Sequence, residues 1–137
     1  MYIIIAGCDK MGASLVNKLS EDGNNVVVID RDKENFSRLG NGSNCMMIAG
    51  MPIDEDVLKE AGIDKADALA AVTADDNTNV MIAQIAQKLY HVPFVIMQTD
   101  DSEKQRVLEA MGLRVICSTT LMVESFFGAL KKGEAEK

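Results

Sequence analysis

The chain opens with the stretch that decides its fold, YIIIAGCDKMGASLV at residues 2–16. A short apolar run leads into Gly7, a second glycine follows at Gly12, and an amphipathic segment takes over. This order predicts a strand, a tight turn and a helix, with a spacing close to the Gly-x-Gly-x-x-Gly pattern that binds dinucleotide phosphates. The middle position of that pattern is Asp9 here. A carboxylate therefore stands where a phosphate would approach the backbone. It should repel a diphosphate unless Lys10 compensates for its charge or the carboxylate turns away to cap the helix.

Apolar runs recur along the whole chain, and helix-like segments separate them. The six runs are residues 2–6, 25–29, 45–49, 68–72, 94–98 and 114–118. Most are almost continuously apolar, as expected for strands that are covered on both faces of a sheet. The runs at 45–49 and 68–72 have weak strand propensity and are assigned from their place in the alternation. The pattern predicts an α/β fold, a Rossmann-like doubly wound, mainly parallel six-stranded sheet with helices on both faces.

The separating segments have the apolar spacing of amphipathic helices. In the first helix, residues 11–22, we expect Met11, Leu15 and Leu19 to face the core. In the longest helix, residues 77–90, the expected buried face consists of Val80, Met81, Ile85, Ala86 and Leu89.

Length and charge restrict the class of protein. The 137 residues suffice for one domain, which we assign to residues 1–132, followed by a charged tail at 133–137. Lys and Arg total 14 against 21 Asp and Glu, so the net charge is −7. Because nucleic-acid binding relies on cations that neutralise phosphates, this charge argues against a nucleic-acid partner and against an anionic membrane surface.

Cysteine usage and hydropathy point to a soluble intracellular protein. Cys8, Cys45 and Cys117 are widely spaced and accompany a single histidine, so we expect reduced thiols and no metal site. No apolar run approaches the roughly 20 residues of a membrane helix, and the short first run lacks the basic region of a signal peptide. The nine methionines are interpreted as core filler.

A second acidic residue favours nucleotide binding. Asp30 closes the second expected strand, where an acid accepts hydrogen bonds from the adenosine ribose hydroxyls. The alternative is that Asp30 caps the next helix, although Asp32 can perform that task. Arg31 beside it is compatible with a 2′-phosphate, which Asp30 itself disfavours.

Two more strand ends carry candidate binding residues. Gly50 follows the third run, and Thr73, Asp75 and Asn79 follow the fourth. Ligands in open α/β sheets lie at the carboxyl ends of the strands, so these residues should share one edge with the glycine turn. Thr73 and Asp76 are also placed as a capping pair on the following helix, and both roles are compatible.

Cys8 has two interpretations. A position near a helix N-terminus favours a thiolate and hence redox sensing, whereas Asp9 beside it opposes a lowered thiol pKa. The second interpretation is a small, half-buried residue. No nucleophile has a plausible base, so we assign no catalytic residue.

Two long stretches, residues 3–39 and 50–86, resemble the TrkA N-terminal domain, the nucleotide-binding lobe of the regulators of potassium conductance (RCK or KTN domains). The phrase VLKEAGIDKADALAAVT followed by DDNTN is more specific than the glycine turn. The resemblance implies a non-enzymatic domain that binds an adenine nucleotide, whether AMP, ADP, ATP or NAD(H). Such a domain gates a membrane potassium channel or transporter from the cytoplasm, at the inner face of the membrane.

The resemblance also implies a set of cofactor-binding residues. Gly7 and Gly12 would form the phosphate turn, Asp30 would hold the ribose, and Gly50 with Met51 would lie near the adenine. The full set is Gly7, Cys8, Asp9, Lys10, Met11, Gly12, Asp30, Arg31, Gly50, Met51, Thr73, Asp75 and Asn79.

Four positions depart from the family pattern. Asp9 replaces the second glycine, Met51 a usual Asp, Ile53 a frequent Thr, and Gln98 a frequent Arg. Each change removes a feature suited to a highly charged ligand. We therefore hypothesise a less anionic ligand, such as AMP, or the loss of the ligand. The alternatives in function are an NAD-dependent oxidoreductase and an assembly module with a decayed nucleotide site.

The C-terminal segment 118–132 is unusually apolar for a helix that serves one core. We expect part of it to meet a partner, and the resemblance implies a homodimer or a higher oligomer. The alternative is a last helix packed on its own sheet. The chain is expected to be either a stand-alone regulatory subunit or a fragment of a larger protein.

Overall fold

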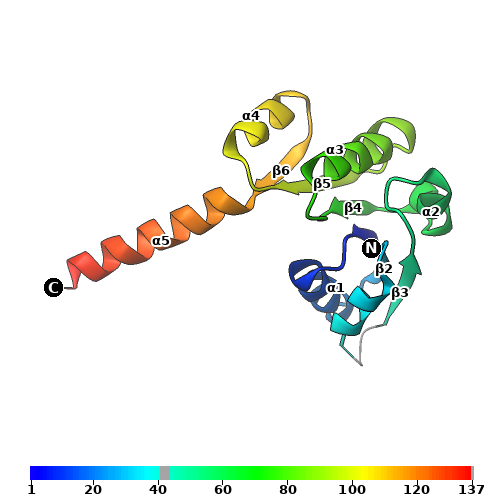
Figure 1. Cartoon of the computed structure of the whole chain (residues 1–137), viewed down its shortest axis with the longest axis horizontal. Helices are drawn as coiled ribbons and strands as arrows, with labels where there is room; N and C mark the ends of the chain where they lie inside the picture. The colour runs from blue at the N-terminus through cyan, green and yellow to red at the C-terminus, as the bar shows by residue number, and fades with distance from the viewer. Residues whose placement is uncertain (41–43, 137) are drawn as a thin grey trace.

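A parallel β-sheet organises the protein, which a computed structural model describes at residues 1–40 and 44–136 (Figure 1). Within these residues the strands are β1 (Tyr2–Ala6), β2 (Asn25–Asp30), β3 (Cys45–Ala49), β4 (Ala68–Ala71), β5 (Phe94–Thr99) and β6 (Arg114–Cys117). They lie in the order β3-β2-β1-β4-β5-β6, and every neighbouring pair is parallel. The chain builds one half outward from β1 and then returns to the centre at β4, which makes the β1–β4 boundary the switch point of the sheet.

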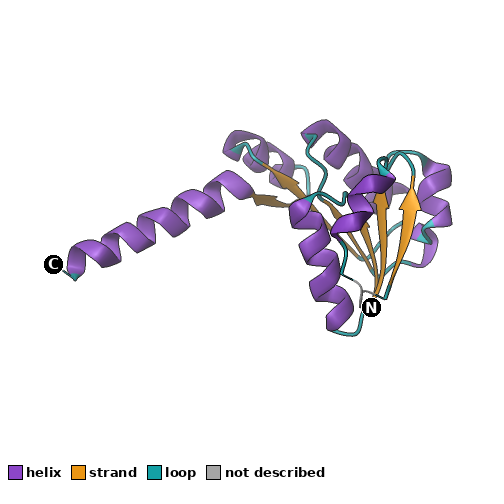
Figure 2. Cartoon of the chain, turned by 60° about the horizontal axis from the view of Figure 1, so that its bottom comes forward, coloured by secondary structure: helices purple, strands orange, loops and turns teal. Residues whose placement is uncertain are grey.

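Helices cover both faces of the sheet (Figure 2). They are α1 (Lys10–Glu21), the 3-10 helix η1 (Lys33–Arg38), α2 (Glu55–Glu60), the 3-10 helix η2 (Ile63–Lys65), α3 (Asp76–Gln84), the π-helical η3 (Ile85–Leu89), α4 (Ser102–Ala110) and α5 (Ser118–Ala135). α1 and η1 pack on one face, and α2, η2, α3, η3 and α4 pack on the other. The predicted doubly wound architecture is confirmed.

Strand β1 shows why the predicted runs are almost continuously apolar. Ile3 and Ile5 belong to the core under α1, whereas Ile4 and Ala6 belong to the core on the opposite face. Because successive side chains of a strand alternate between faces, a strand with a helix on each side buries them all. The two weak runs also form strands: alanine-rich β4 lies at the centre and β3 lies at one edge.

The helices turn only part of the expected side chains to the core. Ala86 is buried, and Leu15, Leu19, Val80 and Ile85 pack against the core while partly exposed. In α1 the buried residues are Gly12, Ala13 and Val16, and Met11 is 44% exposed. In the segment formed by α3 and η3, Met81 and Leu89 are exposed, and the buried residues are Asn79, Ile82, Ala83 and Ala86. A four-residue spacing of apolar residues indicates a helix but does not say which of two adjacent faces of that helix is buried. Small side chains on the buried face allow the helix axis to approach the sheet closely.

The interpretation of the methionines as core filler is wrong. Met97 is buried on β5, but the other eight, among them Met46 and Met47 on edge strand β3, are exposed. The branched residues of β1 and β2 fill the interior instead.

Helix α5 leaves the body of the domain and projects into solvent (Figures 1 and 2). None of its residues is buried, so the alternative in which it packs on its own sheet is wrong. The helix continues to Ala135, beyond the predicted start of the charged tail, whose last residue, Lys137, lies outside the described residues. Among the described helices, none has both the length and the hydropathy that a membrane crossing requires.

Candidate functional site

A cavity of about 340 Å³ lies at the carboxyl ends of β1, β2 and β4, beside the switch point. Its volume falls within the range of roughly 300–1,000 Å³ that is typical of small-molecule sites. The predicted residues that line it are Gly7, Cys8, Asp9, Asp30, Arg31, Met51, Thr73 and Asp75. Residues from four distant segments of the chain therefore meet at the edge of the sheet where they were expected.

The first turn has the backbone shape that its glycine predicts. Gly7 has φ +118°, and its N–H donates to the carbonyl of Ile29 at 2.8 Å. A Cβ at Gly7 would lie 2.9 Å from the carbonyl carbon and oxygen of Val72. Glycine is required here both by the left-handed conformation and by the closeness of the chain that leaves β4.

Asp9 caps helix α1. Its Oδ1 accepts the backbone N–H of Gly12 at 2.9 Å. This bond occupies one of the free donors at the helix N-terminus, the groups that hold phosphate in nucleotide-binding turns. Gly12 in turn has no room for a side chain, because a Cβ there would overlap the carbonyl oxygen of Gly7. The turn keeps its shape, and the protein's own carboxylate satisfies one of the N–H donors at the start of α1.

Asp30 joins the first turn to the end of β2. Its carboxylate is 9% exposed, and Oδ2 accepts the N–H of Cys8 at 2.8 Å. Oδ1 accepts the N–H of Asp32 at 2.8 Å and the amide Nδ2 of Asn35 at 3.1 Å. Because each carboxylate oxygen has two acceptor positions, Oδ2 keeps one for a further donor. The capping alternative for Asp30 is wrong, since Asp32 caps η1 through the N–H of Glu34.

Cys8 is a buried thiol. Burial, and then the negative charge of Asp30, raise its pKa to about 11. Its Sγ lies 3.6 Å from the carbonyl oxygen of Asn35, and its side chain is fully buried rather than half-buried. A thiol that stays protonated at neutral pH is a poor nucleophile, so the redox-sensing interpretation loses its chemical basis.

Asp75 is the cap of α3 on the opposite wall of the cavity. Its Oδ2 accepts the N–H and the hydroxyl of Thr78, at 3.0 Å and 2.6 Å. These hydrogen bonds lower the pKa of the carboxyl and keep it ionised. The predicted capping pair of Thr73 and Asp76 is therefore wrong, because the structure places the cap at Asp75.

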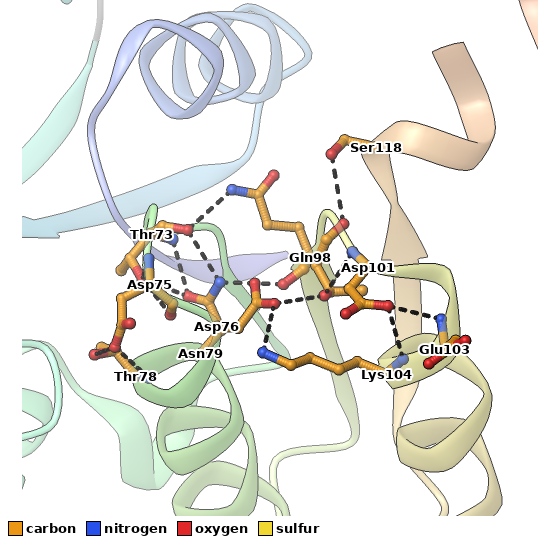
Figure 3. Close-up of polar contacts among 11 residues, drawn as sticks. Thr73, Asp75, Asp76, Thr78, Asn79, Gln98, Asp101, Glu103, Lys104 and Ser118 are labelled. Atoms are coloured by element: carbon orange, nitrogen blue, oxygen red, sulfur yellow. Dashed lines mark hydrogen bonds and ion pairs between the residues drawn. The ribbon is translucent and has the colours of Figure 1, made fainter. Parts of the chain in front are cut away.

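Asn79 is hydrogen-bonded to Thr73, a residue that lines the cavity (Figure 3). It is fully buried, its Oδ1 accepts the N–H and hydroxyl of Thr73 at 2.9 Å and 2.7 Å, and its Nδ2 donates to the carbonyls of Thr73 and Gln98 at 3.0 Å and 3.1 Å. The amide of Gln98 donates to the carbonyls of Val72 and Thr73 at 3.1 Å and 3.0 Å. Gln98 thus ties the end of β5 to the end of β4.

A chain of polar contacts continues from this wall to the first residue of α5 (Figure 3). Asp76 Oδ2 accepts the Thr99 hydroxyl at 2.7 Å and lies 3.4 Å from the ammonium of Lys104. The hydroxyl of Ser118 donates to the Thr99 carbonyl at 3.4 Å. The first residue of α5 is therefore connected to the carboxyl end of β5, which Asn79 and Gln98 link to the end of β4 beside the cavity.

The remaining predicted residues do not line the cavity. Lys10 and Met11 are exposed on the first turn of α1. Gly50 makes room for helix α2 instead, since a Cβ there would lie 2.8 Å from Cγ2 of Val57. Its N–H donates to the Asp30 carbonyl at 3.0 Å.

Sequence reasoning missed five lining residues, which are Asn35, Pro52, Val72, Ala74 and Thr78. Thr78 is part of the DDNTN motif, so the sequence motif could have identified it as a candidate lining residue. Asn35 has no local signal, because its role depends on the fold of η1 back toward Asp30.

Negative charge dominates the lining. It contains the three carboxylates of Asp9, Asp30 and Asp75, and Arg31 is the one cationic residue among the described residues that line the cavity. The site is therefore poorly matched to a ligand with several negative charges.

Several solved structures share the architecture of this domain. The TrkA-N domain of the inner membrane protein ybaL from Escherichia coli matches with a TM-score of 0.83 at 15% identity, covering 94% of this chain and 96% of that one. A Shewanella denitrificans Kef C-terminal domain in AMP-bound form matches with a TM-score of 0.77 at 22% identity, over 96% and 80% of the two chains. A GsuK channel bound to NAD matches with a TM-score of 0.70 at 22% identity, over 84% and 21%. At these identities the likeness shows a shared Rossmann-like fold.

Sequence comparison gives the family. The TrkA-N domain model matches residues 3–119, and the chain belongs to this family. The Trk system potassium uptake protein TrkA of Streptomyces coelicolor is 33% identical over 136 residues, which is 99% of this chain and 61% of that protein. A TrkA homologue of Pyrococcus abyssi is 30% identical over 109 residues, 80% of this chain and 48% of the relative. The chain thus spans about half to three fifths of these relatives.

Proposed function

We propose that this chain is a cytoplasmic nucleotide-binding regulatory domain of a potassium channel or transporter. The observation that carries the proposal is the cavity at the switch point of a TrkA-N domain, bordered by a glycine turn and a buried aspartate. Relatives named as potassium uptake proteins, and similar folds described with AMP and NAD bound, support it.

The ligand we propose is an adenine nucleotide. Asp30 retains one acceptor position on Oδ2 for a ribose hydroxyl, and Arg31 is the cation beside it. Met51 and Pro52 supply apolar surface for a base, and Thr73 and Asp75 form the opposite wall. Gly12, Gly50 and Asn79 would act by shaping the turn and the wall. Lys10 and Met11 would act from the first turn of α1 beside the cavity.

The residues present fit part of a dinucleotide. The tight turn and the acidic end of β2 have the positions that such a ligand requires. The middle of the turn does not fit, because Asp9 places a carboxylate over the helix N-terminus and occupies the Gly12 N–H. A diphosphate seated in this turn would lose that donor and meet a like charge.

Regulation without catalysis is favoured over an oxidoreductase. No thiol or hydroxyl of the cavity is paired with a basic side chain among the described residues that line it, and its thiol has a pKa raised to about 11 by burial and by the charge of Asp30. A regulatory domain works instead by binding its ligand more tightly in one conformation than in another. An assembly module with a decayed site remains the second candidate, because Asp9 fills the turn.

We further propose that residues 1–132 form this domain and that two copies associate through residues 118–132. Met122, Val123, Phe126, Phe127 and Leu130 form one stripe at helical spacing, and each is at least 59% exposed. The last two strands carry exposed Phe94 and Ile116. One copy thus offers both an apolar helix and an apolar sheet surface, which suits a second copy of the same chain.

Calorimetric titration of the purified protein tests the proposal. AMP, ADP, ATP, NAD and NADH are compared at one ionic strength, and we expect saturable binding of at least one of them. Asp30→Ala should weaken that binding at least tenfold, whereas Asp67→Ala, a substitution outside the cavity, should not. If none of the five ligands produces a heat of binding, the assembly module is favoured. Turnover of NADH with a carbonyl substrate would favour the oxidoreductase.

A further inference from the structure

We propose that the cavity selects a nucleoside monophosphate over diphosphates and dinucleotides, and that Asp9 is the residue that sets this selectivity. The inference rests on the proposed nucleotide-binding function and specifies the ligand class of the same site.

Asp9 occupies one of the backbone donors at the start of α1. In a glycine-rich turn the backbone N–H groups at the start of the helix hold the diphosphate, and the middle glycine lets it approach. Here the Gly12 N–H already donates to Asp9 Oδ1 at 2.9 Å, and the middle residue carries a side chain. A diphosphate would have to displace that carboxylate from its cap or remain farther from the backbone.

The charge of the cavity lining is predominantly negative. Asp9, Asp30 and Asp75 line the cavity together with a single cation, Arg31. One cationic side chain can balance much of the charge of a single phosphate group. Each additional phosphate adds negative charge near carboxylates that the fold cannot move, because Asp30 accepts three hydrogen bonds and Asp75 two.

Asp9 differs from the other two carboxylates in its hydrogen bonding. Asp30 and Asp75 hold the turn and the start of α3 in place, so a nucleotide of any phosphate number meets them. Asp9 makes one hydrogen bond, is partly exposed, and is the carboxylate that stands at the start of α1, where a glycine-rich turn usually holds a diphosphate. Selectivity by phosphate number therefore depends on Asp9.

The experiment compares the wild type with Asp9→Gly and Asp9→Asn by titration with AMP, ADP and NAD. Asn is also a good N-cap, so Asp9→Asn removes the charge while preserving the helix start. Asp101→Gly is the matched control, because Asp101 caps α4 in the same way and does not line the cavity. Circular dichroism and thermal unfolding verify that each variant is folded.

We expect the wild type to bind AMP at least tenfold more tightly than ADP or NAD. Asp9→Gly should strengthen ADP and NAD binding at least tenfold with little change for AMP, Asp9→Asn should lie between, and Asp101→Gly should match the wild type. Equal affinities for AMP and ADP in the wild type, or an unchanged ratio in Asp9→Gly, would overturn the inference and leave the proposed function standing. Absence of binding in all four proteins would overturn both.

Discussion

Single polar side chains hold the carboxyl ends of the strands together. Asp30 links the first turn to η1, and Asn79 links the ends of β4 and β5. Both are buried and hydrogen-bonded to backbone or amide groups. Buried polar groups of this kind stabilise a fold chiefly because removing one leaves its partners without hydrogen bonds.

Asn79→Ala is expected to destabilise the domain by about 2–4 kcal/mol, because it leaves buried groups of Thr73 and Gln98 without hydrogen-bond partners. Urea unfolding followed by circular dichroism measures the change. Asn77→Ala on the exposed side of the same helix is the control and should cost less than about 0.5 kcal/mol. Equal effects of the two substitutions would contradict the role assigned to Asn79.

The Cys8 thiol should make stability depend on pH in the alkaline range. Burial and the charge of Asp30 raise its pKa from 9.0 to about 11, so the folded state holds the proton more tightly than the unfolded chain. The stabilising contribution is complete below pH 9 and is lost as pH rises from 9 toward 11. We expect the free energy of unfolding to fall more steeply over this range in the wild type than in Cys8→Ala.

Urea titrations at several pH values test this prediction. Tyr2, whose pKa is raised mainly by burial, and Tyr90, whose pKa is raised mainly by its hydrogen bond to Glu55, are present in both proteins and cancel in the comparison. Parallel slopes for the two proteins between pH 9 and 11 would show that the thiol is not protected.

At the scale of the elements, Gly12 in helix α1 and Gly128 in helix α5 have opposite surroundings. A Cβ at Gly12 would overlap the Gly7 carbonyl oxygen, whereas a Cβ at Gly128 would meet nothing within 4 Å. Intrinsic helix propensity favours alanine at both positions by about 1 kcal/mol. Packing against the first turn should reverse that preference in α1 alone.

Gly12→Ala is expected to lower the free energy of unfolding by about 1–3 kcal/mol, the usual cost of forcing extra atoms into a packed site. Gly128→Ala should leave stability unchanged or slightly increased. Thermal and urea unfolding of both variants provides the measurement. A Gly12→Ala protein as stable as the wild type would mean that α1 can move away from β1 at little cost.

At the scale of the whole molecule, the exposed stripe on α5 predicts self-association. Phe126→Glu places a charge at the centre of the stripe, where Phe126 is 62% exposed in the single chain. Sedimentation velocity at micromolar concentration should show a dimer or larger oligomer for the wild type and a monomer for this variant, since burying an unpaired carboxylate is costly.

Ser125→Glu is the matched control, because Ser125 lies on α5 outside the apolar stripe and the substitution adds the same charge. It should associate like the wild type. A wild type that remains monomeric, or a Phe126→Glu protein that still associates, would remove α5 from the interface.

The strand runs and their order of appearance were predictable from the sequence because burial on both faces leaves a continuous apolar pattern. The face that each helix turns to the core was less predictable. Met81 and Leu89 were expected inside and lie outside, since periodicity reports a stripe and not the surface it meets. Asn35 illustrates a similar limit at the site, because its contact with Asp30 depends on how η1 folds back.

The sequence by itself determined the parallel α/β class, the tight turn at Gly7, the acidic end of β2 and the unusual apolarity of residues 118–132. These features depend on local conformation and on hydropathy, which neighbouring residues encode. Only the tertiary structure decided that Asn79 bridges the ends of β4 and β5 and that α5 leaves the sheet. Those outcomes depend on which hydrogen-bond partners and surfaces the packed strands bring within reach, and distance along the chain does not specify them.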